Sequence, residues 1–215
     1  MPIKIKQNIP GVDFIEKESS NISALNVLII GVFHGEEPQG EYIIEKYLQN
    51  KNFNGIKNNL YFIPCLNSYG IKQNTRGNSN GVDLNRNFPT KNWQLTSKDE
   101  FYSGESPASE VETKYMLEIL EKVKPDVILT LHAPLKCVNF DGPAKDIADK
   151  ISQITGYPVQ KNIGYPTPGS FGTYCGVERN IPTITLEFDE LETSKSLYKK
   201  MEQVLDLLCN LNTDN

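Results

Sequence analysis

Apolar residues follow two patterns along the chain: short continuous runs, and stripes at helical spacing. The runs are rich in Val, Ile and Leu and predict strands buried on both faces. They lie at residues 24–33, 60–66, 126–131 and 181–188, with a short edge strand at 3–5 and an extended piece at 137–140. Helical spacing predicts helices at 38–48, 144–154 and 194–211, and another that begins at Pro107 and is stopped by Pro125. This alternation predicts a single α/β domain over residues 1–215, with a mixed, mostly parallel twisted sheet and helices on both faces.

The helix after Pro107 has two start signals. Pro107 occupies a first-turn position, and Ser109 with Glu112 has the spacing of a capping box. Its buried face is expected to contain Val111, Tyr115, Ile119 and Val123.

Residues 67–103 contain no long periodic segment and many Asn, Gly, Ser and Pro residues. Loops of this length within a compact domain usually have a function. We therefore expect part of the functional site to come from this loop.

Three ionisable residues follow apolar runs. His34 and His132, the two histidines of the chain, and Glu187 each stand at the end of a predicted strand. Ligands of α/β sheets bind beyond the carboxyl ends of the strands. The sequence therefore predicts that these three segments converge on one site.

His34, Glu37 and His132 are candidate zinc ligands, because two imidazoles, a carboxylate and a water form a typical catalytic zinc site. A packed histidine remains the alternative for each residue, and the spacing H-x-x-E is common by chance. Glu36 competes for the acid position, but it is expected to point away from the face that His34 uses.

Side chains alternate between the two faces of a strand, so Glu187 lies on the face opposite to Ile184, Leu186 and Phe188. Glu187 is therefore either a solvent-facing residue or, beside a metal, a general base whose pKa is raised by partial burial.

The long loop carries Arg76, Asn85 and Arg86. An arginine fork with an adjacent amide suits a substrate that ends in a free carboxylate. Solvated surface arginines are the alternative.

Composition narrows the class of partner. A net charge of −5 disfavours nucleic acid and anionic membrane surfaces, so we expect a small molecule or peptide. The segment Met1–Gln7 is too polar for a signal-peptide core, and no apolar run is long enough to span a membrane, which predicts a cytoplasmic protein. The four cysteines are scattered and are expected to be reduced, although a disulfide framework is formally possible.

Several motifs together resemble the zinc carboxypeptidase family, in order from about residue 25 to 190. They are His34-x-x-Glu37, Asn67-Ser68-Tyr69-Gly70, Arg76 with the run Gly81-Val82-Asp83-Leu84-Asn85-Arg86-Asn87-Phe88-Pro89, Ser103-Gly104 with Pro107-x-Ser109-Glu110, His132, and the strand that ends in Glu187. The Asp-Leu-Asn-Arg-Asn-Phe run is the most specific of these motifs. Later segments, Leu131–Pro134, Phe140–Pro143, Pro168–Tyr174 and Gly176–Thr183, resemble the murein peptide amidases of that family.

The resemblance implies a role for each matching residue. His34, Glu37 and His132 would bind one zinc ion, Glu187 would act as general base and then acid, and Arg76 would polarise the scissile carbonyl. Asn85 and Arg86 would hold the substrate carboxylate.

The family also places a tyrosine over the bound substrate, for which the chain offers Tyr165 and Tyr174; Tyr165 is favoured. Phe171 either lines the side-chain pocket or packs in the core.

The expected function is zinc-dependent hydrolysis of the γ-D-glutamyl–meso-diaminopimelate amide bond of murein peptides, by a monomer or homodimer. The alternatives are a carboxypeptidase for other peptides, an aspartoacylase-like zinc deacylase, and a binding module for peptide termini without catalysis.

Overall fold

The computed structural model describes residues 9–212 and contains a seven-stranded sheet of order β1-β3-β2-β4-β7-β5-β6. The strands are β1 (Ile15–Lys17), β2 (Asn26–Ile30), β3 (Asn59–Ile63), β4 (Val127–His132), β5 (Cys137–Asp141), β6 (Val159–Gln160) and β7 (Thr183–Glu187). Strands β3, β2, β4 and β7 run parallel to one another, and β5 is parallel to β6. The pairs β1–β3 and β5–β7 are antiparallel. The expectation of a mixed, mostly parallel sheet is confirmed.

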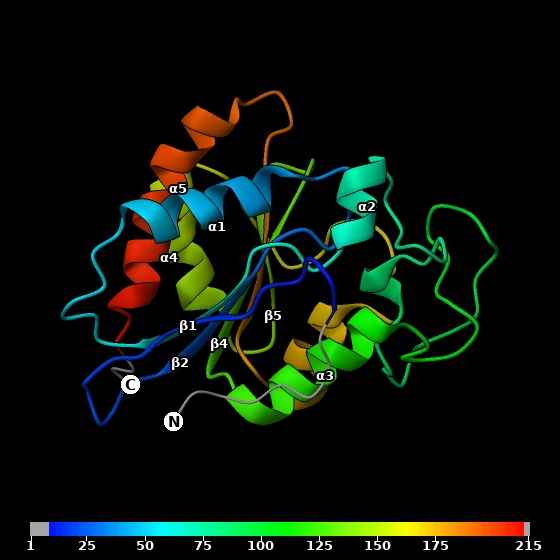
Figure 1. Cartoon of the computed structure of the whole chain (residues 1–215), viewed down its shortest axis with the longest axis horizontal. Helices are drawn as coiled ribbons and strands as arrows, with labels where there is room; N and C mark the ends of the chain where they lie inside the picture. Colours follow the sequence, from blue (N-terminus) through cyan, green and yellow to red (C-terminus); the bar gives the residue numbers. More distant parts are fainter. Residues whose placement is uncertain (1–8, 213–215) are drawn as a thin grey trace.

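Helices cover both faces of this sheet (Figure 1). They are α1 (Gln39–Asn50), α2 (Ser68–Gln73), α3 (Val111–Val123), α4 (Lys145–Thr155) and α5 (Ser194–Cys209), with a 3-10 turn η1 (Leu84–Arg86) and a π-helical turn η2 (Thr173–Val177). In Figure 1, α1, α4 and α5 gather on one side of the strands, and α3 lies on the other.

Two separate cores result from the alternation of side chains in the strands. In β2, Val27 and Ile29 pack with α1, α4 and α5, whereas Leu28 and Ile30 pack with α3 and the segment around Phe171. All four of these β2 side chains are inaccessible to solvent. A continuous apolar run is therefore the correct signature of this strand, because both of its faces are buried.

Some elements differ from the sequence expectation. The short strands β1 and β6 and the helix α2 were not expected, because two to six residues give no clear period. The expected edge strand at 3–5 lies outside the described residues. The apolar runs at 24–33 and 60–66 extend beyond the paired strands β2 and β3, and the surplus residues belong to the adjoining loops.

The expected start of α3 was wrong. The helix begins at Val111 after Glu110, which makes no side-chain cap hydrogen bond, and the Ser109 hydroxyl donates to the Glu110 carboxylate instead of capping the helix. Glu112 accepts a hydrogen bond from the Asn78 amide. Val111 is half exposed, so the apolar part of the buried face starts at Tyr115, after the buried Glu112 and Thr113.

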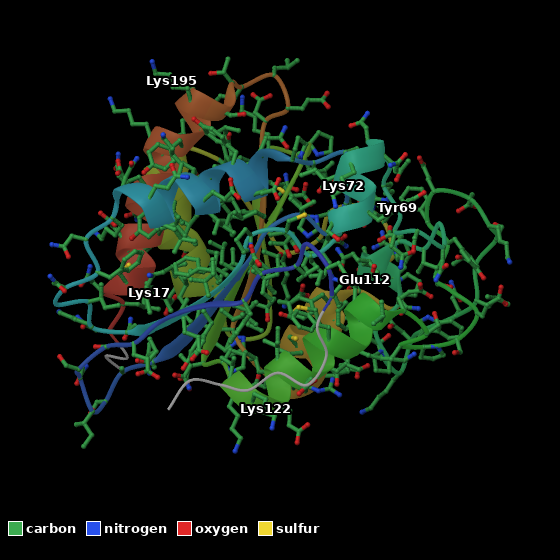
Figure 2. The ribbon with its side chains drawn as sticks, viewed as in Figure 1. Lys17, Tyr69, Lys72, Glu112, Lys122 and Lys195 are labelled. Carbon is green, nitrogen blue, oxygen red and sulfur yellow. The ribbon has the colours of Figure 1, made fainter. Side chains whose placement is uncertain are left out.

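Lysine side chains of two helices lie at the rim of the molecule. Figure 2 labels Lys122 and Lys195, which come from α3 and α5 and point outward at the periphery. Within residues 9–212, no helix is both long and apolar enough to cross a membrane.

Candidate active site

The candidate site lies at the carboxyl edge of the parallel strands β2, β4 and β7. His132 ends β4 and is the parallel partner of Glu187, which ends β7. His34 follows β2, and β2 pairs with the edge of β4 that is opposite to β7. The convergence of the three strand ends, which the sequence predicted, is therefore confirmed by the register.

A tight turn after β2 brings Glu37 back to His34. Val32 has a positive φ of 49°, and the Glu37 amide donates to the His34 carbonyl at 3.1 Å. Gly35 packs directly against the Gly70 backbone, where a Cβ atom would overlap it. This crowded turn places the His34 imidazole and the Glu37 carboxylate on the same side of the turn.

The two imidazoles share the carboxylate of Glu37. His34 Nδ1 lies 2.8 Å from Glu37 Oε1, and His132 Nδ1 lies 3.0 Å from Glu37 Oε2. One nitrogen or oxygen from each residue falls within a cluster 4.8 Å across, and all three side chains are buried. Phe33 stacks on the His132 ring at 5.3 Å and helps to fix its orientation.

Asp83 orients His34 from the other side. Its Oδ1 atom lies 3.0 Å from His34 Nε2, so hydrogen bonding at Nε2 leaves Nδ1 to face the cluster. Asp83 is fully buried and caps η1 through the Asn85 amide. No role was expected for Asp83, although it lies in the most specific motif, because its partner His34 is 49 positions away in the sequence.

The charges of this buried cluster are strongly coupled. Burial lowers the pKa of His34, but Asp83 and Glu37 outweigh this effect and raise the pKa to about 9. Burial raises the pKa of Glu37, yet the two imidazoles bring it far below its usual range. In the same way, His34 and the nearby arginines overcome burial and depress the pKa of Asp83. Both carboxylates are therefore ionised at neutral pH, and they favour positive charge on or beside the His34 ring that lies between them.

Glu187 faces the same cluster without joining the carboxylate bridge. Its side chain is 8% exposed, and burial raises its pKa, with a further contribution from the charge of Glu37. The Leu135 amide donates to Glu187 Oε2 over a long 3.5 Å. A carboxyl with a raised pKa beside the ligand cluster is suited to accept and return a proton.

Arg76 approaches from the central loop. Its Nε donates to Asp83 Oδ2 at 3.0 Å, and Nη1 lies 3.7 Å from Glu37 Oε1. The aromatic ring of Phe101 lies 5.1 Å from the Arg76 guanidinium and 5.7 Å from that of Arg86. Phe101 was not among the predicted site residues, because a single aromatic in an aperiodic loop carries no signal.

Asn85 and Arg86 stand on η1 beside this arginine. Arg86 is buried, and its Nη1 donates to the Asn85 carbonyl at 2.8 Å. The Asn85 side-chain oxygen accepts from the Phe171 amide at 2.9 Å, which ties η1 to the segment before η2.

A cleft of about 450 Å³ joins these residues. The predicted site residues on its walls are His34, Glu37, Arg76, Asn85, Arg86, His132, Tyr165 and Glu187. Tyr165 is partly exposed at the cleft, whereas Tyr174 is not among the lining residues and packs against Phe88 and Arg179. Of the two tyrosines, Tyr165 therefore has the position expected of a residue that covers the substrate.

Phe171 does not fit the expected pocket role. Its ring is 2% exposed and packs between Phe33 and Phe88 in the core on the α3 side of the sheet. The packing role that the sequence left open is the one that the structure supports.

The fold and this ligand cluster agree with one class of protein: the chain belongs to the zinc carboxypeptidase family, whose model matches residues 7–146. Murein peptide amidase A of Escherichia coli K12 is 31% identical over 160 residues, which cover 69% of this chain and 65% of the relative. Murein peptide amidase A of Vibrio campbellii is 29% identical over 194 residues, which cover 84% of this chain and 76% of the relative. The crystal structure of a murein-tripeptide amidase from Escherichia coli O157 matches with a TM-score of 0.78 at 27% identity, covering 90% of this chain and 84% of the other. The chain thus spans just under two thirds of the length of the Escherichia coli relative that it matches by sequence.

The residues present fit the zinc ion of this family. Two imidazoles and one carboxylate form a typical donor set of catalytic zinc, which leaves a coordination position open. Both Nδ1 atoms and the Glu37 oxygens converge within the cluster, and Asp83 fixes the orientation of His34 from outside it. His34, Glu37 and His132 are therefore the residues that would hold one zinc ion.

Proposed function

We propose that the chain is a zinc-dependent amidase that hydrolyses the γ-D-glutamyl–meso-diaminopimelate bond of murein peptides. The observation that carries the proposal is the combination, in one cleft, of a zinc-type donor set, Glu187 and a pair of arginines. The names of the relatives, murein peptide amidase A and murein-tripeptide amidase, support the substrate class.

A bound zinc ion would supply a Lewis acid and lower the pKa of a water to about 7. We propose that Glu187 takes a proton from the attacking water and then gives it to the leaving amine. The raised pKa of Glu187 supports both roles, because a pKa above the ordinary value makes the carboxylate a stronger base and brings its two protonation states closer in free energy.

Arg76 would donate hydrogen bonds to the carbonyl oxygen as it gains negative charge. One such preorganised donor contributes roughly 3 kcal/mol to the barrier reduction. Its Nε bond to Asp83 supports this role, because it leaves the Nη atoms near Glu37 and the cleft.

Asn85 and Arg86 would bind the terminal carboxylate of the departing residue, and Tyr165 would cover it. The location of all three residues on the cleft wall supports this assignment. The partner is then a small peptide with a free C-terminal carboxylate.

The same site chemistry would also serve a carboxypeptidase for other peptides or a zinc deacylase. The relatives named above favour the murein amidase. A binding module without catalysis is disfavoured, because all four candidate metal and base residues are present together in the cleft.

We also propose that the protein acts in the cytoplasm. The four cysteines are buried and unpaired, which is usual in a reducing compartment.

The test is incubation of the zinc-loaded protein with L-alanyl-γ-D-glutamyl-meso-diaminopimelate, followed by mass spectrometry of the products. Release of meso-diaminopimelate is expected, with loss of activity on chelation and recovery with zinc. A peptide with an ordinary α-linked C-terminal residue and an N-acetyl amino acid serve as comparison substrates. Faster cleavage of either comparison substrate would refute the proposed amidase function.

A further inference from the structure

A junction of hydrogen bonds ties the segment before η2 to the chain that runs through η1. Gly169 donates its amide to Thr90 Oγ1 at 3.1 Å, and its carbonyl accepts from the Phe88 amide at 2.9 Å. Two positions further along the chain, the Phe171 amide donates to the side-chain oxygen of Asn85 at 2.9 Å. The part of the loop that carries the proposed carboxylate-binding pair is therefore fastened directly to this segment.

Gly169 lies directly on the backbone of Arg86. Its φ is 74°, a conformation that glycine adopts readily, and a Cβ atom there would overlap the Arg86 carbonyl oxygen. The Arg86 guanidinium is in turn tied to the same stretch of backbone, because its Nη1 donates to the Asn85 carbonyl at 2.8 Å. The position of the guanidinium thus depends on how closely the two backbones approach each other.

Trp93, the one tryptophan of the chain, packs at this point of approach. A Cβ atom on Gly169 would crowd the Trp93 Cδ1 atom as well as the carbonyl of Arg86. The Trp93 amide donates to the Thr90 carbonyl at 3.1 Å, so the turn that carries the indole starts at the residue that holds the Gly169 amide. The indole ring, the glycine and the Arg86 carbonyl therefore meet in one contact.

The indole acts at this contact through its ring and not through its N–H group. Its Nε1 atom is buried, and no atom of residues 9–212 accepts a hydrogen bond from it. A buried donor without an acceptor is unfavourable, so the N–H group does not stabilise the junction. Trp93 is also not among the residues that line the cleft, so an effect on the substrate must pass through Gly169 and Arg86.

We propose that Trp93 is a positioning residue for recognition of the substrate's terminal carboxylate. Its ring holds Gly169 against the Arg86 backbone, and this contact sets the Arg86 guanidinium relative to the Asn85 amide. A carboxylate is bound through hydrogen bonds of defined geometry, which a small displacement of either donor weakens. The inference rests on the proposed function, in which Asn85 and Arg86 bind that carboxylate.

The test compares two peptides that differ in this carboxylate alone. One is L-alanyl-γ-D-glutamyl-meso-diaminopimelate, and the other has a carboxamide in place of the carboxylate on the carbon that bears the scissile nitrogen. The readout is the ratio of their kcat/KM values. A variant that is merely less stable or partly inactive lowers both values equally, so the ratio reports only the recognition of the carboxylate.

Trp93→Ala is expected to lower the preference for the carboxylate peptide about tenfold, because the guanidinium is displaced but not removed. Gly169→Ala should lower it at least as much, since the added Cβ atom pushes on the Arg86 carbonyl. Trp93→Phe keeps a ring at the contact and should retain the wild-type ratio. Melting temperature and zinc content show whether each variant is folded and loaded.

Phe53→Ala is the matched control. It also removes a partly buried aromatic ring, but from the core on the α1 side of the sheet, so the ratio should not change. If Trp93→Ala does not fold, Trp93→Leu keeps apolar volume without the flat ring and should show the same reduced preference.

A ratio within about twofold of the wild type in the folded alanine or leucine variant would overturn the positioning role and leave the proposed function standing. A reduction in Trp93→Phe as large as in Trp93→Ala would also overturn it, because the ring would then not be the part that acts. If the wild-type enzyme releases diaminopimelate from neither peptide, the proposed function fails, and the positioning role fails with it.

Discussion

One wall of the cleft consists of strand ends, and the other is a loop without regular structure. On the first wall, His132 and Glu187 occupy paired positions of adjacent parallel strands, so the backbone ladder of the sheet sets their separation. On the second wall, Arg76, Asn85 and Arg86 belong to a loop that has only the short elements α2 and η1.

On the loop wall, hydrogen bonds of buried amide and carboxylate side chains take the place of the backbone hydrogen bonds of the sheet. Asn67 donates to the carbonyls of Phe33 and Arg76, and Asn87 donates to the carbonyl of Ser103. Asn78 donates to Glu110, and all of these asparagines are buried. The strand wall thus depends on backbone hydrogen bonds and the loop wall on a few side chains, so single substitutions should affect the two walls differently.

The largest effect is expected on the strand wall at Glu187. Glu187→Gln removes the proposed base, and kcat should fall roughly a hundredfold to ten-thousandfold. The fold and zinc content should be unchanged, because the sheet and not this side chain holds the strand end. Steady-state kinetics and metal analysis check this, with Glu45→Gln at an exposed site of α1 as control. Unchanged kcat would remove Glu187 from the mechanism.

Asp83→Asn tests the contact between the two walls. The substitution removes the charge that orients His34 and holds Arg76, so zinc affinity should fall by about ten- to a hundredfold, as for other residues that orient metal ligands. Competition with a fluorescent chelator measures this affinity. Asp146→Asn, at an exposed position of α4, is the control, and an unchanged zinc affinity would show that His34 needs no support from the loop.

Asn87→Ala tests the loop wall by itself. The side chain bonds to three backbone or hydroxyl oxygens and accepts from the Glu110 amide, all within the loop and the start of α3. Leaving these groups unpaired should lower the free energy of unfolding by about 2 kcal/mol. Denaturant unfolding measures it, with exposed Asn54→Ala as control. A loss no larger than that of the control would mean that water replaces the side chain.

The same division separates what the sequence could predict from what it could not. The apolar runs before His34, His132 and Glu187 predicted the strands. Because ligands bind beyond the carboxyl ends of parallel strands, these strands then predicted the location of the site. Asp83 and Phe101 were missed because their partners, His34 and the two arginines, are brought to them by the loop path, which has no periodicity. The false capping box at Ser109 has the same origin: Asn87, far away in the sequence, holds the Ser109 hydroxyl, which bonds to Glu110.

Phe101→Ala is expected to have a smaller effect. The ring packs on the guanidinium groups of Arg76 and Arg86, and each such contact at a partly exposed site contributes about 0.5–1 kcal/mol. Without the ring, the two guanidinium groups are held less firmly in position, so KM should rise about three- to tenfold with little change in melting temperature. Phe101→Tyr keeps an aromatic face and should restore KM, whereas Phe101→Leu should not; equal KM values for the tyrosine and leucine variants would exclude the cation–π role.

The smallest effect concerns the acid stability of the loop wall. Burial raises the pKa of Glu110, but hydrogen bonds from Asn78, Ser109 and Asn80 outweigh it, so the pKa lies below its ordinary value of 4.5. A carboxyl with a depressed pKa in the folded state stabilises the protein above its unfolded-state pKa, and this contribution is lost as the pH falls through the folded-state pKa. The difference in unfolding free energy between wild type and Glu110→Gln should therefore be constant near neutral pH and shrink below pH 4.5. Denaturant unfolding across this range measures the difference. A difference that is independent of pH would mean that Glu110 holds the loop by its shape and not by its charge.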